Sequence, residues 1–345
     1  MTASLKLRLW EDVTRLQQLA SEWSLLWRRC PSATVFQRPE WLLSWVDVYR
    51  PHNSRVIEIR DGERLVGLAA LLVYPRDGQR ILALMGGGVS DYLDTLIDPD
   101  FVEQVIAALW NFLHQHCSDW DLIELTDLPA TSPFLRFHKL HPRVELYSHD
   151  VCPTLRLPAR VGDLGTVIPF KRRASLRNAR NRTLREGTCR IECASEQTAP
   201  MMLEEMFRLH TTRWNEQGES GILGNTLFRA FHRQVVPQLV TQNLARLHGL
   251  FLNDRMIAGI YNFVEASSVS LYLQAFDPEF AHLSPGSQII AITIEDAIAF
   301  RKDSVNFLRG CESYKYSWGA QDTPSFRISA HRVASSPGSV RRGVA

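Results

Sequence analysis

The sequence predicts an α+β protein made of two copies of one module. A hairpin, a strand, a helix and a further strand follow one another in the first half, and the same order returns in the second half. The hairpins, at residues 56–74 and 246–264, turn at Asp61-Gly62 and at Asn253-Asp254. Their turn sequences, ERLVG and DRMIAG, also run in parallel. An order of elements that repeats over more than a hundred residues indicates duplication.

The first half begins with a strand at 5–10 and a helix from Asp12, whose apolar residues recur at helical spacing. A second helix from Pro39 precedes the hairpin, since proline favours the first helical position. We then expect a strand at 80–84, a glycine loop at 86–88, a strand at 92–97, a helix at 101–116 and a strand at 121–125. We interpret the glycine loop as a turn after a strand and not as a phosphate-binding loop, because no helix follows it directly.

In the second half we expect a strand at 268–276, a helix at 287–300 introduced by Ser284-Pro285-Gly286, and a strand at 305–308. We assign residues 1–157 to the first module and 158–333 to the second, with a junction at 158–169. The second module starts with a basic helix at 171–186. Residues 334–345, rich in Ser, Gly and Arg, are expected to be a disordered tail.

Composition sets the broad class. The chain has 345 residues, 45% hydrophobic and 22% charged, with a formal net charge of +2, which suits a soluble globular protein. No apolar run approaches the ~20 residues that span a bilayer, so we expect no transmembrane or export segment. Six scattered cysteines favour reduced thiols and a cytoplasmic location. His, Cys and carboxylate spacing predicts no metal site.

The helix that follows Ser284 is the main functional signal. A helix that starts directly after a strand offers free backbone N–H groups and a positive dipole end, which together bind phosphate. The amides of Gly286, Ser287 and Gln288, with Ser284 as N-cap, are the candidates for that contact. The polar run 310–315 follows the next strand and should lie beside the same opening. This pattern favours group transfer from a donor that carries phosphate.

Several segments, in this order, resemble the CelD/BcsL-like acyltransferases of the GNAT fold superfamily. They are FQRPEW at 36–41, GGGVSDYLD at 86–94, the basic helix, His210 with Arg213 and Trp214, FDPEF at 276–280, SPG at 284–286, and Arg309-Gly310 with Tyr314-Lys315. The resemblance runs from the first strand to about Arg327. Related Fem-type aminoacyl transferases contain two GNAT-like modules. The resemblance therefore implies two tandem GNAT-like modules, each a mixed, mainly antiparallel sheet flanked by helices.

The resemblance also implies acyl transfer from acetyl-CoA or a longer acyl-CoA to an amine or hydroxyl, in polysaccharide, cellulose or envelope metabolism. Glu312 is the candidate general base, Tyr314 the proton donor to the leaving thiolate, and Lys315 a ligand for a substrate anion. Asp91, Tyr92, His210, Arg213 and Trp214 are candidates for contacts with the acceptor, a small molecule or saccharide. Main-chain N–H groups near 273–275 would stabilise the oxyanion if the strand carried a bulge.

Two alternatives stay open. The basic helix favours a Fem-like transferase that uses aminoacyl-tRNA, although DNA is not expected as a partner. Asn306 and Cys311 stand where the family pattern leads us to expect acidic residues, which favours a scaffold without catalytic activity that associates peripherally with envelope biosynthesis machinery. Solvated surface, a phosphate-bearing ligand and a polyanionic glycan are the further interpretations of the basic helix.

Overall fold

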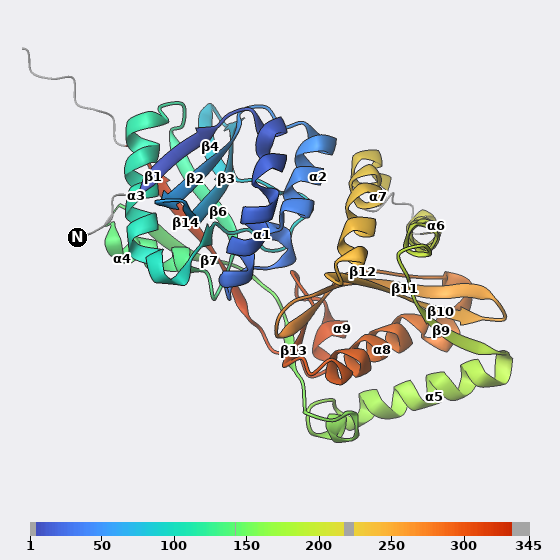
Figure 1. Ribbon diagram of the computed structural model, residues 1–345. Helices are drawn as coiled ribbons and strands as arrows, with labels where there is room; N and C mark the ends of the chain where they lie inside the picture. Colours follow the sequence, from blue (N-terminus) through green and yellow to red (C-terminus); the bar gives the residue numbers. More distant parts are fainter. Residues whose placement is uncertain (1–4, 142, 217–223, 333–345) are drawn as a thin grey trace, which may run out of the picture.

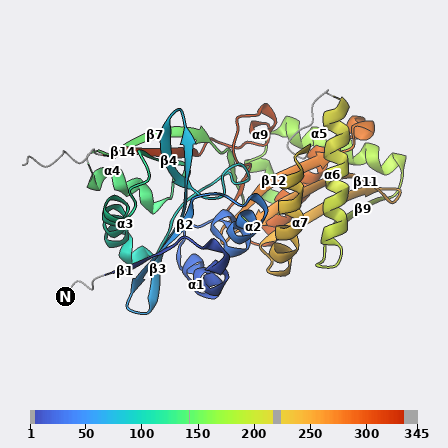
Figure 2. The ribbon, with the colours of Figure 1, turned by 90° about the horizontal axis from the view of Figure 1, so that it is seen from above.

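The computed structural model describes residues 5–141, 143–216 and 224–332. It contains two mixed sheets, each flanked by helices, so the predicted fold class is confirmed (Figure 1). Along the molecule the layers are α3, the first sheet, a shared helical layer, the second sheet, and then α8 with α5 (Figures 1 and 2). No helix in the described ranges combines the length and the apolar character that a membrane span requires. The expected disordered tail at 334–345 lies outside the described residues.

The first sheet has the strand order β1-β2-β3-β4-β6-β14-β7, with β5 paired to β3. Its strands are β1 (Lys6–Trp10), β2 (Ser54–Asp61), β3 (Arg64–Arg76), β4 (Gln79–Leu84), β5 (Leu96–Ile97), β6 (Leu122–Pro129), β7 (Glu145–Val151) and β14 (Pro324–His331). All neighbours are antiparallel except β4 and β6, which pair through only two residues of each strand. This parallel pair follows from the crossover through α3.

The second sheet has the order β8-β13-β12-β11-β10-β9. Its strands are β8 (Thr154–Arg156), β9 (Cys189–Cys193), β10 (Ala245–Leu252), β11 (Arg255–Val264), β12 (Ser268–Phe276) and β13 (Ser304–Asn306). Again a single pair is parallel, β12 with β13, and again a helix connects its two strands. The two sheets thus repeat one topology around one parallel pair, as the repeated order of elements predicts.

Helices cover both faces of each sheet. The α-helices are α1 (Ala20–Arg29), α2 (Pro39–Tyr49), α3 (Val102–His116), α4 (Phe137–Leu140), α5 (Phe170–Glu186), α6 (Ala199–Glu216), α7 (Thr226–Thr241), α8 (Pro285–Ala299) and α9 (Ser313–Tyr316). Short 3-10 helices are η1 (Val13–Leu19), η2 (Val35–Gln37), η3 (Pro99–Phe101), η4 (Pro133–Arg136), η5 (Val161–Thr166) and η7 (Pro278–Leu283).

One apolar core joins the two halves of the chain. Trp41 of α2 packs edge-on against Phe231 of α7 and Phe263 of β11, with ring centroids 4.7 and 5.3 Å apart. This cluster also contains α1 and α6 residues, whereas α3 and α8 cover separate clusters on the outer faces of the two sheets. Buried aromatic pairs of this kind hold the two sheets in one fixed relation.

Each half gives one strand to the sheet of the other. We assigned β8 to the first module, but it pairs with β13 of the second sheet. We assigned β14 to the second module, but it lies between β6 and β7 of the first sheet. Sheet membership therefore does not follow the division at residue 157. Sequence patterns show where strands lie and contain no signal for a pairing partner more than 140 residues away.

Most predicted elements are present, with local differences at their ends. The helix expected from Asp12 begins as a 3-10 helix and becomes α-helical at Ala20. The strand expected at 92–97 shortens to β5, because the chain before it forms the loop that meets the second half. The helix expected from Ser287 begins two residues earlier, at Pro285.

Candidate functional site

A cavity of about 490 Å³ lies where β12 and β13 separate. These strands pair only from Ser268↔Ser304 to Ser270↔Asn306, and β12 then continues to Phe276 without a partner on that side. The walls come from the unpaired part of β12, the start of α8, residues 307–315, and Asp91 of the first half. A short parallel pair that splays apart thus creates an opening between the two halves of the chain.

β12 carries a bulge at the wall of this cavity. The pairing with β11 runs from Tyr261↔Leu273 directly to Asn262↔Leu271, so Tyr272 is an extra residue. A bulge leaves the backbone of the extra residue outside the regular ladder and re-aims it. The bulge needed for an oxyanion contact is therefore present, one residue before the predicted 273–275 segment.

The start of α8 forms the second wall. Ser284 occupies the N-cap position with a left-handed backbone (φ 52°), and its side chain makes no capping hydrogen bond. Ser284, Gly286 and Ser287 line the cavity. The Gln274 side chain donates to the Gly286 carbonyl at 2.9 Å, and a Cβ at position 286 would lie 2.6 Å from Gln274 Nε2. A side chain at position 286 would have to displace the end of the Gln274 side chain, which lies beside the helix N-terminus at the cavity wall.

Arg172 of the basic helix provides a cation in the same cavity. It lies over the ring of Trp318, 4.1 Å from the centroid, and burial lowers the pKa of its guanidinium. Its Nε is buried, and within the described residues it has no hydrogen-bond partner. An unsatisfied buried donor on a cation is costly, so this group points to an anionic ligand.

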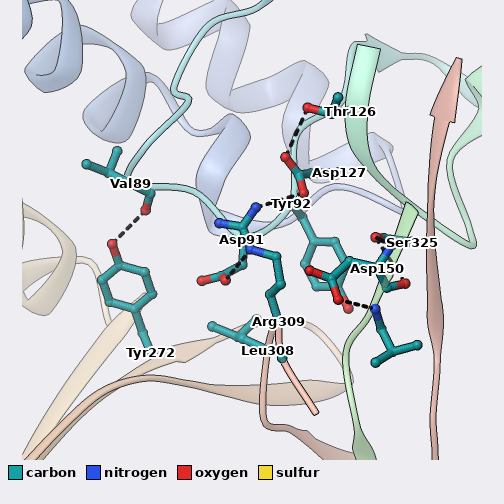
Figure 3. Close-up of polar contacts among 12 residues, drawn as sticks. Val89, Asp91, Tyr92, Thr126, Asp127, Asp150, Tyr272, Leu308, Arg309 and Ser325 are labelled. Carbon is teal, nitrogen blue, oxygen red and sulfur yellow. Dashed lines mark hydrogen bonds and ion pairs between the residues drawn. The ribbon is translucent and has the colours of Figure 1, made fainter. Parts of the chain in front are cut away.

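The first half contributes Asp91, which faces Arg309 of the second half (Figure 3). Arg309 Nε lies 3.6 Å from Asp91 Oδ1, and its Nη1 donates to Asp127 Oδ1 at 2.9 Å. The Asp91 side chain is 19% exposed. Burial raises its pKa to about 6, although the Arg309 charge acts in the opposite direction. A carboxylate with this pKa binds and releases a proton near neutral pH.

The loop that holds Asp91 is anchored to β12. Tyr272 donates its hydroxyl hydrogen to the carbonyl of Val89 at 2.6 Å (Figure 3). Trp41 Nε1 donates to Ser90 Oγ at 3.0 Å in the same loop. The bulged residue of β12 thus fixes the position of the carboxylate from the opposite half.

The turn after β13 is held by two side chains. Leu308 has a left-handed backbone (φ 58°), and its N–H donates to Asn306 Oδ1 at 2.8 Å. Lys315 is buried, and its Nζ donates to the carbonyls of Leu308, Arg309 and Gly310 at 3.0, 2.7 and 3.1 Å. Three carbonyls engage all three hydrogens of the ammonium group. The geometry therefore gives Lys315 a role in holding this turn and does not support the predicted contact with a substrate anion.

Glu312 and Tyr314 both line the cavity. Glu312 Oε2 lies 2.9 Å from Lys315 Nζ, and its side chain is 58% exposed. Tyr314 is partly exposed and meets the ring of Phe307 at 6.4 Å. Tyr314 can therefore donate a proton from the cavity wall, whereas the carboxylate of Glu312 is largely exposed and pairs with Lys315.

The remaining predicted residues are distributed unevenly. His210 of α6 lines the cavity, whereas the side chains of Arg213 and Trp214 lie outside the described part of the chain. Tyr92 is buried outside the cavity, where its hydroxyl accepts from Asn306 Nδ2 at 3.0 Å. Gln288 is buried as well, and its side chain donates to Thr183 and Leu283. Its amide N–H donates to the Ser284 carbonyl at 3.3 Å, so neither donor of Gln288 faces a ligand.

Sequence reasoning did not single out Arg172, Arg309 or Asp127 as site residues. The basic helix was recognised as a whole, but its side chains have different surroundings. Arg172 lines the cavity, Arg180 pairs with α8 and Arg177 is exposed, and only the folded structure distinguishes them. Asp127 has a left-handed backbone (φ 59°) at the end of β6, where no sequence pattern marks it. Arg309 could have been found from the sequence, because Arg309-Gly310 is one of the segments that carry the family resemblance.

One segment of the chain, and its fold as a whole, are similar to those of known proteins. Residues 171–316 match the family model described as acetyltransferase (GNAT) domain. Among curated proteins no significant match was found.

Solved structures share the whole fold. FemX aligns with a TM-score of 0.65 at 11% identity, over 89% of this chain and 95% of its own. L-PGS from Bacillus licheniformis aligns at 0.60 and 12% identity, over 89% and 90%. The C-terminal domain of a putative lysylphosphatidylglycerol synthetase from Agrobacterium fabrum aligns at 0.59 and 11% identity, over 91% of each chain. At such identities the likeness concerns the fold alone.

The cavity draws its α8 wall, its strand wall and its buried arginine from the matched segment, and it receives one carboxylate from the other half. Residues 171–316 match a GNAT-type acetyltransferase domain, and the two-sheet fold that contains them is similar to that of FemX.

Proposed function

We propose that the protein transfers an acetyl or longer acyl group from an acyl-CoA to an amine or hydroxyl acceptor, by direct attack and without an enzyme-bound intermediate. The observation that carries this proposal is one cavity that combines the N-terminus of α8, the partly buried cation of Arg172 and the shielded carboxylate of Asp91. The helix N-terminus and Arg172 can bind the phosphates of an acyl carrier, and Asp91 can receive the proton of the acceptor.

The donor lies along α8 and β12. Gly286 offers its main-chain N–H group to the diphosphate, and Arg172 adds positive charge from the neighbouring helix. The N–H of Ser287 donates to the Ser284 carbonyl at 3.0 Å, so Ser287 contributes its side chain at the cavity wall. The thioester then extends along the unpaired segment of β12, where the backbone at the Tyr272 bulge supports the developing oxyanion. A bulky side chain at position 286 would displace the Gln274 amide and occupy part of this binding site.

Asp91 is the proton acceptor in this proposal. The acceptor's nitrogen or oxygen attacks the thioester carbon and transfers its proton to Asp91. The C–S bond then breaks, and Tyr314 supplies a proton to the leaving thiolate. Asp91 suits this role better than Glu312, because its carboxylate is shielded and its pKa is raised to about 6 by burial. The carboxylate of Glu312 is largely exposed and pairs with Lys315.

His210 extends the acceptor side of the cavity. We assign the acceptor to polysaccharide or envelope metabolism, on the resemblance to CelD/BcsL-like proteins, and the reaction to the cytoplasm. The fold shared with FemX supports a second candidate, in which an aminoacyl-tRNA replaces acyl-CoA as donor. A scaffold without activity is the third, and its motivation weakens here because Asn306 has a structural role between Tyr92 and Leu308.

One experiment separates these candidates. Release of free thiol from acetyl-CoA is measured with a panel of amino sugars and nucleotide sugars, beside calorimetric titration with acetyl-CoA alone. Thiol release and binding heat, both abolished in Gly286→Val, support the acyl-CoA transferase. Binding heat without turnover on any acceptor supports a scaffold, and transfer from aminoacyl-tRNA with no heat from acetyl-CoA supports the second candidate.

A further inference from the structure

Positive charge is concentrated in one segment of the chain. Residues 156–190 contain ten Lys or Arg and two Asp or Glu, which leaves 29 basic and 35 acidic residues elsewhere. The segment is therefore strongly cationic on a protein that is otherwise slightly anionic. Most of this charge lies on α5, which runs along the outer side of the second half, away from the first sheet (Figure 1).

The inner side of α5 accounts for only part of the charge. Ala179 and Thr183 are buried against the domain, Arg172 stacks on Trp318, and Arg180 pairs with Glu295 at 2.8 Å. These residues lie within about a third of the helix circumference at 100° per residue. They fix the helix to α8 and to Trp318, and they leave the opposite half of its surface uncovered.

The uncovered half, which we call the outer face, carries four basic residues, Lys171, Arg177, Arg182 and Arg185. All four are exposed, and none makes an ion pair within the described residues. Charges that stabilise a fold usually have a nearby partner, as Arg180 has on the inner side. Four unpaired cations on one face instead suit an external polyanion.

Two large apolar side chains lie on the same outer face. Phe170 is 74% exposed and Leu184 is 65% exposed. They are fourteen residues apart, which places them about 21 Å apart along the helix and within about 40° of one another around it. Exposed apolar groups at both ends of a basic stripe match an interfacial helix, in which the cations meet headgroups and the apolar residues enter the acyl boundary.

We propose that the outer face of α5 docks the protein on an anionic lipid surface. The charge complementarity is that of a polybasic segment with acidic headgroups. A small phosphate ligand would not use cations spread over four helical turns. A nucleic acid would use the cations but gains little from an exposed leucine. The proposal is independent of the chemistry in the cavity, because it concerns only where the protein resides.

The test is sedimentation of the full chain with vesicles, either of phosphatidylcholine alone or with about 30% phosphatidylglycerol. A charge variant combines K171Q, R177Q, R182Q and R185Q. An apolar variant combines F170S and L184S. The matched control is L25S with M201S, since these side chains are 54% and 71% exposed on other helices. Circular dichroism checks that each variant is folded, and heparin affinity reports polyanion binding without lipid.

We expect the wild-type chain and the control to bind the anionic vesicles at least about tenfold more tightly than the neutral ones, with loss of binding as salt increases. The charge variant should lose both vesicle and heparin binding. The apolar variant should lose about tenfold in vesicle binding and keep its heparin affinity. Equal binding of the apolar variant and the wild type to vesicles would overturn the proposal in favour of a nucleic acid or another soluble polyanion. Failure of the wild type to bind anionic vesicles would overturn it outright.

Discussion

The two halves of the chain share one topology, yet their parallel strand pairs end differently. Beyond β12 and β13 the chain leaves a cavity at the N-terminus of α8, and the first turn of that helix contains no acidic residue. Beyond β4 and β6 the space is closed by the chain itself, since Met85 and Leu93 are buried and the Leu93 N–H donates to the Asp127 carbonyl. Among the residues that the structure describes, the separation of β12 and β13 thus leaves a cavity, whereas the chain fills the corresponding position beyond β4 and β6.

The helix starts differ in charge as well. α3 has Glu103 in its first turn, and Asp98 and Asp100 precede it in the η3 turn. Asp98 already holds Arg29 and Arg64, each at 2.7 Å. Carboxylates at a helix N-terminus satisfy the dipole and repel phosphate. In the proposed function the two modules therefore have different roles: the second binds the donor, and the first supplies the carboxylate that faces it.

The D91N variant tests most directly whether the two halves have different roles. If the first half supplies the proton acceptor, kcat should fall by about 10²–10⁴-fold while the affinity for acetyl-CoA stays unchanged. In the wild type, kcat/KM should rise with pH through about 6, because Asp91 must lose its proton to act. Steady-state kinetics from pH 5 to 8 measure both effects.

D100N, on the exposed carboxylate near the start of α3, is the control and should leave kinetics unchanged. A wild-type rate for D91N would remove the first half from the chemistry.

The donor seat is tested by R172M, which removes the buried cation and keeps much of its apolar bulk. The dissociation constant of acetyl-CoA should rise about tenfold, since a charge-assisted hydrogen bond contributes about 1.5–3 kcal/mol. Calorimetric titration measures this change. R177M, on the exposed side of the same helix, should bind acetyl-CoA as the wild type does. Similar losses in the two variants would mean that the helix acts through its overall charge.

The contact between the halves is tested by R309Q. Arg309 lowers the pKa of Asp91, so its removal should move the rising limb of the pH profile to higher pH. A loss of roughly tenfold in kcat/KM at pH 7 is expected from this shift and from poorer positioning. A pH profile identical to that of the wild type would show that Arg309 and Asp91 are not coupled.

The last prediction concerns the stability of the first half and leaves the reaction aside. Burial raises the pKa of Asp94 to about 7, above its ordinary 3.8, so the folded state holds a proton that the unfolded state releases. Asp94 should therefore lower the free energy of unfolding by roughly 1.4 kcal/mol for each pH unit as the pH rises from 5 to 7. D94N preserves the shape and removes this cost. Urea unfolding at pH 5 and 8 should show the variant gaining on the wild type at the higher pH.

Much of the fold could be predicted from the sequence, because hairpins with Asp-Gly and Asn-Asp turns and amphipathic helices are specified by local patterns. The opening at Ser284–Ser287 was also found, since a Ser-Pro-Gly helix start is a local signal. What could not be predicted depends on distant contacts. The sequence suggests that Lys315 binds a substrate, but the fold uses its ammonium group to hold the Leu308 turn. The raised pKa of Asp91 arises from burial, which no local pattern in the sequence indicates.

The exchange of β8 and β14 couples the two halves during synthesis. β14 is among the last described residues to leave the ribosome, and until it arrives β6 and β7 each expose an unpaired edge. The first sheet, although encoded early, is therefore completed late, and its nascent form is the state most exposed to aggregation. A cut between the halves would give two fragments that each lack a strand, so this chain is expected to fold as one interlocked unit.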